Sequence, residues 1–126
     1  MSMPELKKRM ALIVDDENDI CFLLGTILKQ KNIQSVCAGS LAEAEKSLEN
    51  HPDVSMIFLD NYLPDGWGIK HISDLKSKYP GSLIVMITAH DNSSDRLQAV
   101  NNGVDFFIGK PFTIDLINRT IDRLIA

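Results

Sequence analysis

The chain has 126 residues, of which 44% are hydrophobic and 24% charged, and its net charge is −4 at neutral pH. This length suits a single domain that buries its own core, and the composition excludes a disordered chain. No stretch stays apolar for long enough to span a membrane, and the acidic balance argues against direct binding of nucleic acid.

The chain then alternates short apolar runs with amphipathic stretches. The run at residues 10–14 predicts a strand buried on both faces. A helix is predicted next, from an apolar stripe with helical spacing: Ile20, Leu23, Leu24, Ile27 and Leu28. A weaker strand is predicted at residues 35–38.

A second strand–helix unit follows the same plan. Residues 40–43 read Ser-Leu-Ala-Glu, a capping box that starts a helix with Ala44 and Leu48 facing inward. Residues 56–59 are a third apolar run and predict a third strand. The next segment, residues 61–68, is rich in Pro, Asp and Gly and predicts a loop.

The last part of the chain completes the alternation. A third helix is predicted from inward-facing Ile69, Ile72 and Leu75. Residues 83–87 predict a strand, and a short helix after it should bury Leu97 and Val100 and stop at Gly103. Residues 106–108 predict a fifth strand. Thr113 should cap a final helix with a stripe made of Ile114, Ile117, Ile121 and Leu124.

The element order is therefore strand–helix, five times over. Such an order predicts an α/β fold of three layers, a doubly wound (βα)5 arrangement with a five-stranded parallel sheet between helices. No internal repeat or second domain is visible.

Polar residues occur where the predicted strands end. Asp15 and Asp16 follow the first strand, Asp60 the third, Thr88 the fourth and Lys110 the fifth. Because parallel strands end at one edge of the sheet, these side chains should meet there, where ligands of such sheets bind. A single Asp after a strand is often only a turn former. The prediction therefore rests on all five polar residues being placed at strand ends.

The chemistry of this set favours a cation and a phosphoryl group. Three carboxylates held together either take up protons or bind a cation, and oxygen ligands without nearby His or Cys indicate Mg²⁺. A metal, a lysine and a hydroxyl around one carboxylate suit the stabilisation of transferred phosphoryl charge.

The two cysteines, Cys21 and Cys37, show neither zinc nor redox spacing. We expect both to be reduced, buried thiols, as is usual in cytosolic proteins.

Nearly the whole chain, from about Met10 onward, resembles the receiver domain of bacterial two-component response regulators. The resemblance is carried by Val14-Asp15-Asp16-Glu17, Leu59-Asp60, Leu63-Pro64 with Gly68, Ile87-Thr88-Ala89, and Lys110-Pro111-Phe112. It implies a flavodoxin-like sheet with strand order 2-1-3-4-5. It also implies a single receiver domain over residues 1–126, with 1–9 as a lead-in and any output domain outside this chain.

The resemblance assigns roles within the phosphorylation site. Asp60 resembles the phospho-acceptor. Asp15 and Asp16 look like the acidic pair that binds Mg²⁺, which Mn²⁺ can replace, with Asp60 and the backbone carbonyl of Tyr62 as further ligands. Lys110 is similar to the lysine that contacts the phosphoryl group.

Further roles concern the switch and its support. Thr88 resembles the switch hydroxyl, Phe107 the switch aromatic residue, and Ala89 the small residue beside the site. Pro111 is expected to follow a cis peptide bond. Pro64 and Gly68 are expected to be structural.

Two bulky side chains, Tyr62 and His90, flank the path of the attacking water in relatives of this kind. We expect them to slow self-dephosphorylation. The phosphoryl lifetimes of the Tyr62→Ala and His90→Ala variants test this hypothesis, and a solvated loop histidine is an equal alternative for His90.

The function implied is a cytoplasmic switch. A sensor histidine kinase or histidine phosphotransfer protein would phosphorylate Asp60, and the change would reach an output domain or target protein. The surface of the fourth helix, fifth strand and fifth helix would respond, with dimerisation there as one expectation.

Three other functions compete with this one. An aspartate-nucleophile phosphatase needs a second Asp two residues after Asp60, where Tyr62 stands, so no enzyme activity beyond self-phosphorylation and self-dephosphorylation is expected. A flavin site is disfavoured because residues 15–19 are acidic rather than rich in Ser, Thr and Gly. A phosphorylation-independent pseudo-receiver remains the principal alternative.

Overall fold

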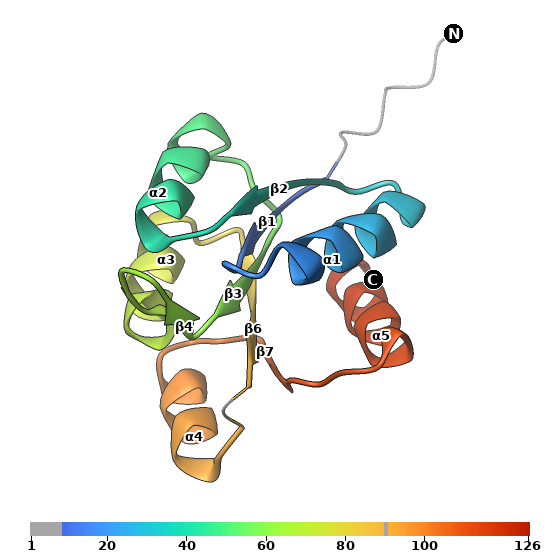
Figure 1. The fold of residues 1–126 in the computed structure, drawn as a ribbon. Coiled ribbons are helices and arrows are strands. Elements are labelled where there is room, and N and C mark those ends of the chain that lie inside the picture. Colours follow the sequence, from blue (N-terminus) through green and yellow to red (C-terminus); the bar gives the residue numbers. More distant parts are fainter. Residues whose placement is uncertain (1–8, 90) are drawn as a thin grey trace, which may run out of the picture.

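The computed structural model describes residues 9–89 and 91–126. Five parallel strands form its central sheet (Figure 1): β1 (Met10–Val14), β2 (Gln34–Ala38), β3 (Met56–Asp60), β6 (Leu83–Thr88) and β7 (Phe106–Gly109). Their order is β2-β1-β3-β6-β7, which confirms the predicted 2-1-3-4-5 topology. The three inner strands are almost fully buried, as their continuous apolar runs predicted.

Within the described residues, five α-helices cover the sheet: α1 (Asn18–Gln30), α2 (Leu41–Asn50), α3 (Ile72–Lys78), α4 (Ser93–Asn101) and α5 (Ile114–Ile125). Figure 1 shows α1 and α5 on one face and α2 and α3, with α4 below them, on the other. A short hairpin of β4 (Tyr62–Leu63) and β5 (Gly66–Trp67), followed by the 3-10 turn η1 (Gly68–His71), links β3 to α3.

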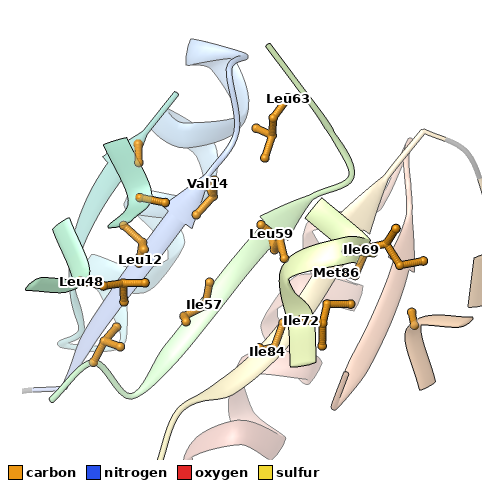
Figure 2. Close-up of a cluster of buried hydrophobic side chains, with 14 residues drawn as sticks. Leu12, Val14, Leu48, Ile57, Leu59, Leu63, Ile69, Ile72, Ile84 and Met86 are labelled. Atoms are coloured by element: carbon orange, nitrogen blue, oxygen red, sulfur yellow. The ribbon is translucent and has the colours of Figure 1, made fainter. Parts of the chain in front are cut away.

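Each face of the sheet has its own apolar core. One core joins the sheet to α1 and α5, with Ile13, Phe58, Leu28 and Ile121 among its fully buried members. The other lies beneath α2, α3 and α4, and Figure 2 shows its strand side chains pointing toward Leu48 and Ile72 on two of these helices: Leu12, Val14, Ile57, Leu59, Ile84 and Met86. Two well-packed faces fix the sheet, and with it the strand ends that carry the polar residues.

The predicted caps are present. Ser40 accepts a hydrogen bond from the Glu43 N–H at the start of α2, and Thr113 accepts one from the Leu116 N–H at the start of α5. Gly103, with φ of +102°, ends the segment after α4, where only glycine adopts this backbone without strain.

The inward face predicted for α4 was wrong. Leu97 and Val100 are 63% and 60% exposed, whereas Ala99 is fully buried. The small Ala99 side chain lets the helix approach the core closely, so the two larger apolar residues face solvent. Ile114, expected on the buried stripe of α5, is also exposed, while Ile117 and Ile121 are buried.

The expectation for the cysteines was wrong as well. Cys21 of α1 and Cys37 of β2 form a disulfide, with Cα atoms 6.0 Å apart. The two residues are 16 positions apart in sequence, and only the packing of α1 against the edge strand β2 brings them together.

Among the described residues, no helix is long and apolar enough to cross a membrane.

Candidate functional site

The carboxyl ends of four strands meet at one edge of the sheet. The registers pair Val14 with Leu59 and Thr88 with Gly109, so the residues that follow these strands become neighbours. The backbone N–H of Lys110 donates to the Thr88 carbonyl over 2.7 Å, which continues the β6–β7 pairing up to the site. The predicted convergence of polar residues at this edge is therefore present.

Three carboxylates form an acidic cluster there. One oxygen from each of Asp15, Asp16 and Asp60 lies within 4.8 Å of the other two. Asp15 and Asp60 are only 4% and 6% exposed, and Asp16 is exposed. The donors are all oxygens, which suits a hard cation such as Mg²⁺ or Ca²⁺, and the exposed side leaves room for water or a substrate oxygen.

Burial raises the pKa of Asp60 from 3.8 to about 6. The positive charge of Lys110 opposes this rise, and the negative charge of Asp15 adds to it. A buried carboxylate beside a second one is poorly solvated, so an added cation would gain more free energy here than at an ordinary surface carboxylate.

Lys110 supplies the single ammonium found close to the cluster in the described part of the chain. Its Nζ lies 2.9 Å from Asp15 Oδ2, 3.3 Å from Glu17 Oε2 and 3.5 Å from Asp60 Oδ2. Burial alone would lower the pKa of Lys110, but the hydrogen bond to Asp15 and the nearby carboxylate charges raise it above 10.5. The ammonium therefore stays charged beside the candidate acceptor.

The loop after β3 holds Asp60 in place. The Tyr62 N–H donates to Asp60 Oδ1 at 3.4 Å, and the buried side chain of Asn61 accepts from the Ile69 N–H at 2.9 Å. Gly68 passes so close that a Cβ atom there would lie 2.2 Å from the Asp60 carbonyl oxygen. An added Cβ at position 68 would therefore clash with the Asp60 backbone.

Two aromatic rings of this loop pack against each other. The rings of Tyr62 and Trp67 meet edge to face with centroids 4.6 Å apart, and both remain partly exposed. Pro64 stands exposed in the turn between them. The roles predicted for Tyr62, as a metal ligand through its carbonyl and as a shield, stay predictions.

Thr88, fully buried, ends β6, and the exposed Ala89 follows it. Phe107 of β7 is half-buried, and the Arg96 guanidinium of α4 lies 4.8 Å from the centre of its ring. The same guanidinium pairs with Asp91, so α4, its preceding loop and β7 are joined beside Thr88.

The structure brings Asp15, Asp16, Asp60 and Lys110 together, and Thr88 ends the neighbouring strand β6. The Lys110–Pro111 peptide bond is cis, as expected. His90 lies outside the described residues. The sequence assigned no role to Glu17 or Asn61. The contact of Glu17 with Lys110 could have been suspected, because Glu17 directly follows the acidic pair. The burial of Asn61 is visible only in the structure.

Comparison with known proteins finds one matching family and several relatives. The family described as the response regulator receiver domain matches residues 11–122. The phosphate regulon transcriptional regulatory protein PhoB of Escherichia coli is 36% identical over 107 residues, which cover 83% of this chain and 46% of that protein. The response regulator protein PilR of Pseudomonas aeruginosa is 29% identical over 116 residues, 92% of this chain and 26% of that protein.

The chain thus spans less than half the length of these curated relatives. Among solved structures, the beryllofluoride-activated NtrC4 receiver domain dimer superposes with a TM-score of 0.84 at 32% identity, covering 91% of this chain and 94% of that one.

Proposed function

The chain belongs to the response regulator receiver domain family, and from this we propose that Asp60 accepts a phosphoryl group in a Mg²⁺-dependent reaction. The observation that carries the proposal is the position of Asp60: a buried carboxylate inside an acidic cluster, with the Lys110 ammonium 3.5 Å away. This combination provides a nucleophile, a cation site and a fixed positive charge in one place.

The donor would be a phosphohistidine of a sensor histidine kinase or a histidine phosphotransfer protein. An Asp60 oxygen attacks the phosphorus, the P–N bond breaks, and the leaving imidazole nitrogen takes up a proton. When bound at Asp15, Asp16 and Asp60, Mg²⁺ supplies charge neutralisation for the phosphoryl oxygens. Lys110 then exchanges part of its contact with Asp15 for a phosphoryl oxygen.

The response would begin at Thr88. Its buried hydroxyl stands at the end of β6, next in sequence to the loop that leads to α4. Attraction of this hydroxyl to the new phosphoryl group would shift the loop, release Phe107 from its contact with Arg96 and change the outer surface. The protein is thus proposed to be a phospho-acceptor switch rather than an enzyme that turns over a substrate.

The surface formed by α4, β7 and α5 is the proposed output face. It exposes the apolar side chains of Leu97 and Val100 on α4 and of Ile114 on α5, which a partner would cover. An output domain, a target protein or a second copy of the chain would bind there in the cytoplasm. The dimer formed by the activated NtrC4 receiver domain supports the last of these.

A pseudo-receiver that docks without phosphorylation is the second candidate. The exposed face of α4 would serve either function, but the complete set of Asp15, Asp16, Asp60 and Lys110 favours the phospho-acceptor.

Incubation with acetyl phosphate and Mg²⁺, read by intact mass, separates the two candidates. We expect one phosphoryl adduct that disappears in Asp60→Asn and in excess chelator. Asp74→Asn, which changes an exposed carboxylate on α3, should leave it unchanged. A wild-type protein without an adduct, where a known receiver is modified, would favour the pseudo-receiver.

A further inference from the structure

The Cys21–Cys37 disulfide lies directly behind the acidic cluster. Cys37 is opposite Ile13 in the β1–β2 pairing, and one residue further along β2 the Ala38 carbonyl accepts the Asp15 N–H over 3.0 Å. Cys21 stands in the first turns of α1, where its N–H donates to the Glu17 carbonyl. The bridge therefore joins α1, which follows residues 15–17 in the chain, to β2, which lies beside the end of β1.

Both sulfur atoms also approach Asp15 itself. Cys21 Sγ lies 3.6 Å and Cys37 Sγ 3.9 Å from the backbone oxygen of Asp15. The side chain of the same residue accepts from the Glu17 N–H at 2.9 Å and from Lys110 Nζ at 2.9 Å. The disulfide therefore lies on the backbone side of Asp15, whose carboxylate belongs to the acidic cluster.

We propose that Cys21 and Cys37 form a reversible thiol–disulfide exchange site, whose substrates are low-molecular-weight disulfides and thiols, and that its oxidation state sets the divalent-cation affinity of the acidic cluster. The second half rests on the function proposed above. With the bridge closed, α1 and β2 are tied together at Asp15, so less ordering remains to be done when a cation binds. With the bridge open, cation binding must itself order these two segments, and the free-energy cost of that ordering lowers the affinity.

The exposure of the two residues gives the order of the exchange. Cys37 is exposed on the edge strand of the sheet, whereas Cys21 is half-buried. The Cys37 thiolate attacks one sulfur of glutathione disulfide, forming a mixed disulfide and releasing one glutathione thiolate. The Cys21 thiolate then attacks the Cys37 sulfur and releases the second glutathione thiolate.

The electrons and protons balance in this sequence. The protein dithiol loses two electrons, glutathione disulfide gains them, and the two protons that leave Cys21 and Cys37 end on the two glutathione thiols. Excess reduced glutathione drives the reverse reaction. Disulfides of cytosolic proteins are mostly transient and redox-sensing, which agrees with a regulatory rather than a purely structural bridge.

The test uses the full chain, oxidised with glutathione disulfide or reduced with a phosphine. Mg²⁺ is titrated against the fluorescence of Trp67, the single tryptophan of the chain, which packs on Tyr62 beside the site. Hydrogen exchange of the amides of residues 15–21 is measured in parallel without metal. Cys21→Ser and Cys37→Ser serve as matched variants that cannot close the bridge.

When the wild type is reduced, we expect severalfold weaker Mg²⁺ binding and faster hydrogen exchange of the amides of residues 15–21. Both variants should match the reduced wild type under reducing conditions, and neither should reach the Mg²⁺ affinity of the oxidised wild type in glutathione disulfide. Equal Mg²⁺ affinity and equal exchange in the two redox states would overturn the proposal, as would a pair that stays reduced in glutathione disulfide. Absence of Mg²⁺ binding in both redox states would instead contradict the metal role proposed above. The hydrogen-exchange rates would still decide whether the bridge orders residues 15–21.

Discussion

Lys110 places its ammonium nitrogen 2.9 Å from Asp15 Oδ2. The positive charge of the site is therefore already bound to one of the acids that a divalent cation would need. Lysine and cation share these carboxylates, so they repel each other and compete for the same oxygens.

Removal of this charge should strengthen cation binding. For Lys110→Met we expect Mg²⁺ to bind about tenfold more tightly, equivalent to roughly 1.4 kcal/mol, while phosphoryl uptake becomes slower. Isothermal titration measures the affinity. Lys76→Met, which removes a lysine paired with Asp105 instead, is the matched control. Unchanged or weaker binding in Lys110→Met would show that the two cations do not compete.

The raised pKa of Asp60 predicts a pH-dependent stability without metal. The folded protein keeps the Asp60 proton up to about pH 6, whereas the unfolded chain releases it near 3.8. The free energy of unfolding therefore falls as the pH rises from about 4 to 6, and Asp60→Asn escapes this loss. The variant should be more stable than the wild type at pH 7.5, by at most about 3 kcal/mol.

Thermal melts in chelator measure this difference, which should close at pH 4. Asp74→Asn, at an exposed carboxylate, should show no comparable gain at pH 7.5. A gap between Asp60→Asn and the wild type that is equally large at pH 4 would mean that some other effect of the substitution is responsible.

The close approach of Gly68 to Asp60 predicts a steric effect. A Cβ atom at position 68 would meet the Asp60 carbonyl oxygen and the Leu59 side chain, so Gly68→Ala must displace the backbone of the acceptor. We expect a loss of about 1–3 kcal/mol in unfolding free energy together with weaker Mg²⁺ binding. Gly81→Ala is a matched control, because no atom lies within 4 Å of the added carbon there. Equal denaturant midpoints for the two variants would disprove this account of Gly68.

The fold was largely predictable because its signals are local. Five apolar runs, the caps at Ser40 and Thr113 and the glycine at position 103 each depend on neighbouring residues, and the structure has all of them. The polar residues at the strand ends could be placed together because parallel topology alone brings those ends to one edge.

The remaining features depend on contacts between distant segments. The spacing of apolar residues in α4 does not show that the helix buries Ala99 and exposes Leu97. Which face is buried depends on how the helix packs against the rest of the protein. The Cys21–Cys37 bridge requires the distance between α1 and β2, and composition argued for free thiols. The buried Asn61, which anchors the loop after Asp60, looks like any turn residue in sequence.

Thr88 should transmit the change without being needed for the chemistry. We expect Thr88→Ala to accept the phosphoryl group at a rate near that of the wild type but to show little movement of α4. Amide chemical shifts of residues 93–101, with and without beryllofluoride and Mg²⁺, report this movement. Thr88→Ser keeps the hydroxyl and should restore it. A full α4 response in Thr88→Ala would remove this residue from the switch.

The most direct test of the central claim is to trap the acyl phosphate at its residue. The protein is incubated with acetyl phosphate and Mg²⁺ and treated with borohydride, which reduces an aspartyl phosphate to homoserine, and the peptides are mapped by mass. Homoserine at position 60, absent when Mg²⁺ is chelated, is the predicted result. Homoserine at another aspartate, or at none while a known receiver is labelled in parallel, would contradict the assignment of Asp60 as the phospho-acceptor.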